Sequence, residues 1–200
     1  MTSVITGDII NSRNVSNEIW IASLKDIFKE VDAGQIYRGD SFQIEIENAS
    51  EVLLTAIKIK SAIKMIKEID VRMAIGIGSK NFSAKKVTEA NGEAFINSGF
   101  AFDHLLKKQT LAMKSPWLEI DKQINISFAL SLLIMDNWTV NSAEFVQFSL
   151  KNPNLTQKEI SKNLRISQSS VSERRKRSGF DEIMKLEEYF SEIMHQKTTK

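Results

Sequence analysis

The sequence predicts an α+β protein with two parts, one that mixes strands with helices and one that is all helical. Over residues 1–120 the hydrophobic periodicity changes between strand and helix in the order β-α-β-β-α-β, which is the ferredoxin-like arrangement. The segment Asn-Pro-Asn at residues 152–154 is expected to end the preceding helix. Two short helices with the spacing of a helix-turn-helix follow it. We therefore expect a ferredoxin-like domain over 1–120, a helical connector over 121–152 and a helix-turn-helix domain with a C-terminal helix over 153–200.

The elements of the first part follow from local patterns. Alternating apolar residues predict a strand over residues 3–10, a hairpin over residues 35–47 and a strand over residues 70–79. Apolar residues at helical spacing predict two helices between these strands, one capped by Ser16 and one capped by Asn48. The lysines of the second helix repeat at helical spacing and predict its solvated face. They are Lys58, Lys60, Lys64 and Lys67.

Three more elements are expected before the second part begins. Residues 89–108 predict a helix, and residues 112–120 predict an edge strand in which Pro116 breaks the hydrogen-bond ladder. Residues 123–136 are apolar nearly all round, which predicts a buried connector helix. Gly76 and Gly78 form a Gly-x-Gly at the end of a strand. Because no helix starts in the required register after them, a dinucleotide site is excluded.

Two carboxylates lie where the predicted sheet would bring strand ends together. Asp8 stands near the end of the first strand, and Asp40 follows Gly39 at the tip of the hairpin. Two carboxylates at neighbouring strand ends repel each other unless one is protonated or a divalent cation binds both. Because Mg²⁺ takes oxygen ligands, the pair predicts a Mg²⁺ site with a phosphate-bearing ligand. The other interpretation, in which both aspartates are turn residues, stays open.

The second part carries the most specific local signals. Thr156 and Glu159 form a capping box at the start of one helix, and a three-residue turn leads into a second helix over residues 168–178. In a helix-turn-helix the second helix enters the major groove of DNA. The candidates for base contacts are Gln168, Ser169 and Ser172, and those for phosphate contacts are Arg174, Arg175, Lys176 and Arg177. The alternative is a plain helical hairpin with a charged face.

Charge and composition narrow the function classes. The net charge is +2, but residues 151–180 hold eight basic and two acidic residues, which favours a polyanionic partner. The absence of cysteine excludes a disulfide framework and a thiolate metal site, and two histidines are too few for a zinc centre. No apolar run reaches about 18 residues. We expect a cytoplasmic protein without a membrane span.

Five segments resemble the SatD family of bacterial proteins, and together they cover most of the chain. They are VITGDIINSR at 4–13, YRGDSFQ at 37–43, MAIGIGS at 73–79, GEAFINSG at 92–99 and LTQKEISKNLRISQSSVSERRKRSGF at 155–180.

The order of the first four segments is also similar to the palm domain of class III nucleotidyl cyclases and diguanylate cyclases. This resemblance implies a palm-type fold and a pair of metal ions held by Asp8 and Asp40. It implies a purine nucleotide contacted by Gly7, Ile9, Arg13, Arg38, Gly39 and Asn97. The cyclases use an arginine where this chain has Ala101, and a purine-selecting lysine where it has Ile36. Losing a positive group that stabilises the transition state raises the activation barrier by on the order of 3 kcal/mol. Arg13, Arg38 or Arg72 could take the place of the missing arginine.

Three functions remain open at this point. The first is a DNA-binding transcriptional regulator whose cyclase-like domain senses a nucleotide with Mg²⁺. The second is an enzyme, a nucleotidyl cyclase or polymerase, and the missing arginine favours the first over it. The third is a catalytically inert dimerisation platform that carries a helix-turn-helix. A homodimer is expected because palm sites and DNA half-sites both use two chains.

Overall fold

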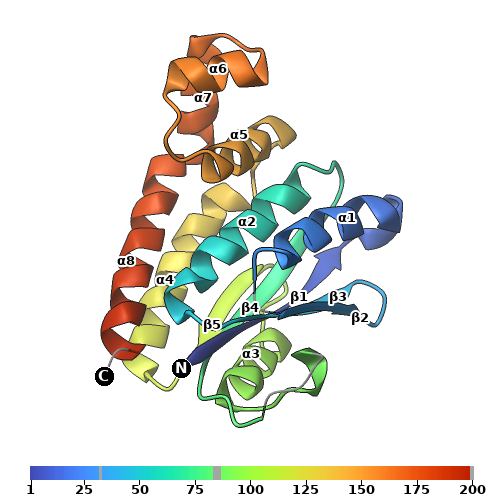
Figure 1. Ribbon diagram of the computed structural model, residues 1–200, viewed down its shortest axis with the longest axis vertical. Coiled ribbons are helices and arrows are strands. Elements are labelled where there is room, and N and C mark those ends of the chain that lie inside the picture. Colours follow the sequence, from blue (N-terminus) through green and yellow to red (C-terminus); the bar gives the residue numbers. More distant parts are fainter. Residues whose placement is uncertain (32, 83–86, 199–200) are drawn as a thin grey trace.

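A computed structural model describes residues 1–31, 33–82 and 87–198. Its centre is a five-stranded sheet in the order β2-β3-β1-β4-β5 (Figure 1). Neighbouring strands run antiparallel except for β5, which lies parallel to β4 at the edge. The strands are β1 (Thr2–Ile10), β2 (Ala33–Tyr37), β3 (Ser41–Ile46), β4 (Asp70–Gly78) and β5 (Leu111–Lys114).

Helices cover both faces of this sheet, as Figure 1 shows. Helices α1 and α2 lie on one face and α3 lies on the other, so the predicted α+β class is confirmed. The first five helices are α1 (Asn17–Phe28), α2 (Val52–Lys64), α3 (Glu93–Asp103), α4 (Leu118–Met135) and α5 (Val140–Lys151). The last three are α6 (Gln157–Leu164), α7 (Gln168–Ser178) and α8 (Phe180–Thr198).

The hairpin and the helices around it form where predicted, but Ser16 makes no side-chain capping bond and Asn48 caps the 3-10 turn Ala49–Glu51 that leads into α2. Two boundaries further along the chain differ. The helix predicted over 89–108 is shorter, because Asn91 instead pairs with Phe82 in a short antiparallel bridge and α3 begins at Glu93. The strand predicted over 112–120 ends at Lys114. Ser115 there donates its hydroxyl to Asp121 in the first turn of α4, at 2.6 Å, so the chain turns into a helix.

Helix α3 packs directly on β4, which explains a glycine in that strand. A Cβ atom at Gly76 would lie 2.1 Å from the carbonyl oxygen of Ala94 and 2.2 Å from the amide nitrogen of Ser98. No other residue type permits this approach, as expected for a glycine in a strand interior.

The connector helix departs from its prediction. The sequence predicts that α4 is buried on all sides, yet Ile126, Leu130 and Leu133 are 64%, 62% and 70% exposed. The other face of the same helix is buried through Ile124 and Phe128. The apolar pattern correctly predicts a helix, but one face of that helix stays largely exposed.

Lys60 also departs from its prediction. Its spacing predicts a solvated helix face, but its side chain is fully buried. Its ammonium group donates to Asp70 at 3.0 Å, to Asp136 at 2.5 Å and to the hydroxyl of Thr110 at 3.1 Å. The side chain therefore connects α2, β4 and the end of α4.

The last three helices are attached to the sheet part through a shared apolar core. Helix α5 packs on α2 and α7, and α8 runs along α2 and α4. One continuous cluster joins buried residues of the sheet to Ile160 in α6, Val171 in α7 and Phe190 in α8. The domain boundaries at 120 and 152 stay predictions. Within the described ranges, no helix has the length and apolar character needed to cross a lipid bilayer.

Candidate functional site

The first candidate site lies on the α3 side of the sheet, where β1 pairs with β4. Asp8 stands opposite Arg72, and the two side chains form a forked ion pair. The Arg72 Nε and Nη2 atoms each lie 2.7 Å from one Asp8 oxygen. This hydrogen bond raises the pKa of the Arg72 guanidinium, so the group stays charged.

Asp40 lies beside this pair, at the tip of the hairpin. The amide of Ile9 donates to the backbone carbonyl of Asp40 at 3.2 Å, and β1 places Asp8 opposite Ser41. The Asp40 carboxylate accepts a hydrogen bond from the hydroxyl of Ser12 at 2.6 Å. Asp40 therefore directly precedes the β3 residue that pairs with Asp8, and each aspartate has a partner of its own within the chain. A metal ion shared by the two stays a prediction.

Two aromatic residues complete this surface. The guanidinium of Arg72 lies 5.2 Å from the ring centre of Phe102 in α3. Burial raises the pKa of the Tyr37 phenol, Arg38 opposes that rise, and the charges of Asp8 and Asp103 add to it. The phenol is therefore a neutral hydrogen-bonding group at physiological pH. Sequence reasoning missed Tyr37, although alternation along β2 places it on the opposite face from its neighbour Ile36.

The predicted nucleotide contacts divide into two groups, of which the first borders the aspartates. Gly39 has a φ of 88° in the hairpin tip, with open space around it, and Arg38 precedes it there. Arg13 is exposed in the 3-10 turn Ser12–Asn14, next to the Ser12 that binds Asp40. These three residues border the hairpin tip, and their contact with a nucleotide stays a prediction.

The remaining three predicted contacts serve packing or structure. Gly7 leaves room for the Phe42 ring, since a Cβ atom there would lie 2.5 Å from it. Ile9 is buried in the core. Asn97 is buried and donates to the carbonyl of Ile77, five residues or roughly 16 Å along β4 from Arg72. The structure does not bring Asn97 to the aspartates.

Asp8 and Asp40 offer few free oxygen ligands for a divalent cation. Among the described residues no group of three or more carboxylates and histidines comes together. Two carboxylates are enough for Mg²⁺ when a phosphate and water supply the other ligands. Here, however, both oxygens of Asp8 are engaged by Arg72. The Asp8 carboxylate becomes available to a cation only after Arg72 moves away from it.

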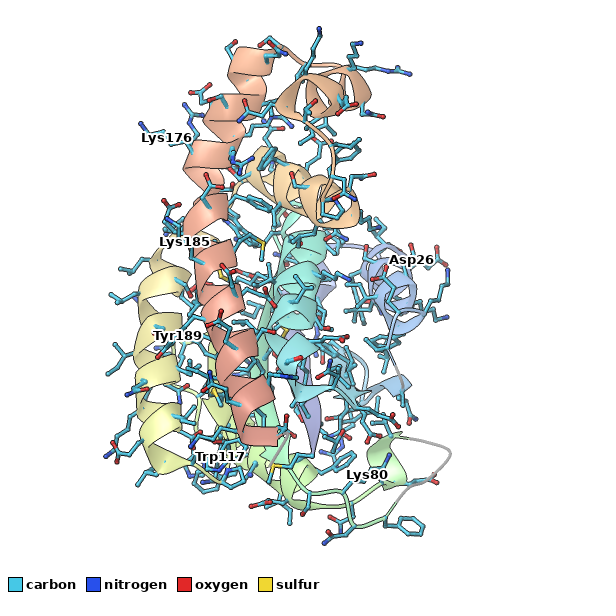
Figure 2. The ribbon with its side chains drawn as sticks, turned by 60° about the vertical axis from the view of Figure 1, so that its left-hand side comes forward. Asp26, Lys80, Trp117, Lys176, Lys185 and Tyr189 are labelled. Atoms are coloured by element: carbon cyan, nitrogen blue, oxygen red, sulfur yellow. The ribbon has the colours of Figure 1, made fainter. Side chains whose placement is uncertain are left out.

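The second candidate site is the outer face of α7. One side of this helix faces the rest of the protein and carries residues 171, 174, 175 and 178. Val171 and Ser178 are fully buried there. The opposite side is exposed. It carries Gln168, Ser169, Ser172 and Lys176, which we call the α7 outer face. In Figure 2 the Lys176 side chain extends from α7 into solvent.

The arginines of α7 have partners within the chain. Arg174 pairs with Glu144 of α5. Arg175 forms a fork with Asp181 of α8, with its Nη2 atom at 2.6 Å, and lies 5.5 Å from the Phe180 ring centre. Arg177, whose side chain is 73% exposed, pairs only locally with Glu173. Of the three predicted arginines, only Arg177 extends away from the protein. Glu144 lies 30 residues before its partner, so no local signal identifies the pair.

The connection between α6 and α7 is a tight turn. The capping box of Thr156 and Glu159 begins α6 as predicted, and Arg165, with a φ of 56°, ends it. Ser167 then caps α7 by accepting from the amide of Ser170 at 3.1 Å. Ile160 and Val171 are buried where the two helices meet. The pair protrudes at one end of the molecule (Figure 1).

Comparison with known proteins supports one assignment. No curated protein matches the chain. A model of the SatD family matches residues 3–193, which is nearly the whole chain and includes both candidate sites. The chain therefore belongs to the SatD family.

Proposed function

We propose that this protein is a DNA-binding transcriptional regulator in which α6 and α7 form a helix-turn-helix. The observation that carries the proposal is the division of α7 into two sides. Its inner side is fixed to the protein by Val171, Arg174 and Arg175, while its outer face is polar, basic and exposed. A recognition helix needs this arrangement, because one side must hold it rigidly while the other enters the major groove.

The residue types on the α7 outer face suit direct contact with bases. Gln168 and Ser169 stand in the first turn, where recognition helices reach base edges, and Ser172 follows one turn later. Glutamine can pair with adenine through two hydrogen bonds, and serine can bond to several bases. We assign base contacts to these three residues.

Phosphate contacts are assigned to Lys176 and Arg177 at the end of α7. Both are exposed, and Arg177 has only an i,i+4 partner, which holds it weakly. Arg174 and Arg175 are assigned a structural role. Their ion pairs with Glu144 of α5 and Asp181 of α8 hold α7 in its orientation relative to these helices.

Fluorescence anisotropy with the gene's own upstream duplex and a scrambled duplex tests this proposal. Wild type should prefer the upstream duplex, and the double variant Lys176→Ala/Arg177→Ala should bind both duplexes more weakly. Its salt dependence should flatten by about 0.9 log units for each phosphate that the variant no longer neutralises. Lys107→Ala removes a charge from the loop after α3 and should change nothing. Wild-type binding to either duplex weaker than about 100 μM at low salt would refute the proposal.

A second candidate function concerns the aspartates. The pairing of β1 with β3, which puts Asp8 opposite Ser41 and thus near Asp40 in the hairpin, supports a palm-type, ferredoxin-like domain that binds a purine nucleotide with Mg²⁺. In this proposal Arg72 leaves Asp8 for a nucleotide phosphate, and the cation takes its place. The missing counterpart of the cyclase arginine, at Ala101, favours sensing over turnover.

Thermal unfolding with and without Mg²⁺ and nucleoside triphosphates tests this second candidate. Ligands that bind the folded state raise the melting temperature, by an amount that corresponds to about 2.7 kcal/mol at a hundredfold excess over Kd. We expect a rise in wild type, no rise in Asp40→Asn, and a rise with Mg²⁺ alone in Arg72→Ala, which frees Asp8. If millimolar Mg²⁺ with nucleotide shifts none of these proteins, the aspartates are structural and the sheet part is an inert platform.

A further inference from the structure

Helix α4 presents an apolar ridge to solvent. Ile126, Leu130 and Leu133, which we call the α4 ridge, follow one another at spacings of four and three residues. Leu106 lies beside this ridge, shares a groove with Leu133 and is 74% exposed. Figure 2 shows α4 at the outer edge of the molecule, with its outward side chains in solvent. Spacings of four and three residues are those of the contact seam between two helices.

The ridge is large and uncharged. Between Gln123 and Met135, α4 holds no acidic or basic residue. A leucine-sized side chain offers on the order of 100 Å² of apolar surface, so the four exposed side chains contribute roughly 250 Å² per chain. A twofold pair would cover about 500 Å² of apolar surface, which is about half of the apolar area of a standard interface of about 1,600 Å².

The chemistry of this face is symmetric about Leu130. The ridge residues Ile126 and Leu133 stand four positions before and three positions after it. One step further out, Gln123 and Asn137 stand seven positions before and after it, and both are amides. Twofold interfaces need such self-complementarity, since each surface contacts a copy of itself.

The ridge also has grooves that match its shape. On one side a groove of about 430 Å³ lies between Leu106, Ala129 and Leu133. On the other side a groove of about 320 Å³ lies between Leu130, Ile134 and Leu186 of α8. Helices pair by fitting the ridge of one into the groove of the other. A surface with a ridge and adjacent grooves can bind its own copy in this way.

From these observations we propose that the α4 ridge is a homodimer interface, in which a second copy of this chain packs α4 against α4 with Leu130 at the twofold axis. The proposal rests on α4 and the grooves beside it, and it stands whether or not α7 binds DNA. A homodimer explains why this face of α4 is apolar although it is largely exposed in a single chain.

Sedimentation velocity and a cysteine cross-link test the interface. Wild type should sediment as a dimer, twice 22.7 kDa, at micromolar concentration. Leu130→Glu should weaken dimerisation by at least about 100-fold, because it brings two carboxylates together at the axis. The chain has no cysteine, so Leu130→Cys introduces a single thiol that should form an intermolecular disulfide under mild oxidation.

Leu118 provides the matched control. It is 65% exposed on the same helix but lies about 120° away from Leu130 around the helix axis. Leu118→Glu should leave the dimer intact, and Leu118→Cys should not cross-link. A monomeric wild type at about 100 μM would overturn the proposal, and so would a Leu118→Glu variant that dissociates as readily as Leu130→Glu.

Discussion

Lys60 shows how one residue can connect three elements. Its fully buried ammonium group is satisfied by two carboxylates and a hydroxyl, contributed by β4, by the end of α4 and by the segment before β5. Lys64 adds a hydrogen bond to the Asp136 carbonyl at 2.8 Å. The helical lysine spacing is consistent with a solvated face, and only the tertiary structure distinguishes Lys60 from its neighbours.

Removing this charge is expected to be costly. Lys60→Met leaves Asp136 without its ion-pair partner and Asp70 with Lys64 alone, and breaking a buried pair in this way costs on the order of 3 kcal/mol. Lys58→Met, on the same helix, removes a partly exposed pair with Glu30 and should cost about 1 kcal/mol or less. Guanidinium unfolding of both variants measures the difference. If both variants lose the same free energy of unfolding, the contacts of Lys60 with Asp70, Asp136 and Thr110 do not stabilise the fold.

Glu187 gives a prediction for pH dependence. Burial raises the pKa of this α8 carboxyl above its usual value near 4.5, and the adjacent Glu188 adds to the rise. A carboxyl whose pKa is raised on folding stabilises the fold below its unfolded pKa and loses that contribution as pH rises through the folded pKa. Glu187→Gln should therefore be more stable than wild type at pH 7, and the difference should shrink towards pH 4.

Thermal unfolding across this pH range measures the effect. The control is Glu192→Gln, an exposed position on the same helix. A Glu187→Gln variant that is less stable than wild type at pH 7 would contradict the assignment.

At the scale of elements, the predictions with the strongest local signals succeed, whereas the weaker patterns over 89–108 and 112–120 give the wrong bounds. The hairpin at Gly39 and the bounds of α7 at residues 168 and 178 form as expected, because turn residues and caps act within a few positions. The predictions that depend on distant neighbours do not. An apolar helix such as α4 has the same sequence pattern whether its second face meets the core or a separate chain.

The inner side of α7 gives an element-scale prediction. Arg174 joins α7 to α5 through Glu144, so Arg174→Ala should lower stability by roughly 1 kcal/mol. It should reduce DNA affinity less than Lys176→Ala does, because Arg174 faces the protein. Chemical unfolding and anisotropy on the same two variants compare both properties. A larger loss of affinity for Arg174→Ala, with unchanged stability, would assign Arg174 to the DNA interface instead.

At the scale of the whole molecule, the continuous core joins the sheet part to α7. The indole of Trp138 donates to the carbonyl of Ser178 at 2.8 Å, and Phe145 of α5 contacts Phe180 edge to face. These contacts hold the end of α7 against α5, which packs on α2. Packed elements therefore connect the sheet to α7. Sequence patterns predict the strands of the sheet and the helix α7, but not the packing between them. Trp138 and Ser178, for example, are 40 residues apart in the sequence.

The most direct test of the account is a selection of DNA duplexes from a random library by wild type and by Gln168→Ala. The central claim is that the α7 outer face binds DNA and distinguishes sequences. Wild type should enrich a defined motif, and Gln168→Ala should lose the preference at one position of it, at a cost of about 1 to 3 kcal/mol there. Failure of wild type to enrich any motif, or an identical motif for Gln168→Ala, would contradict this assignment.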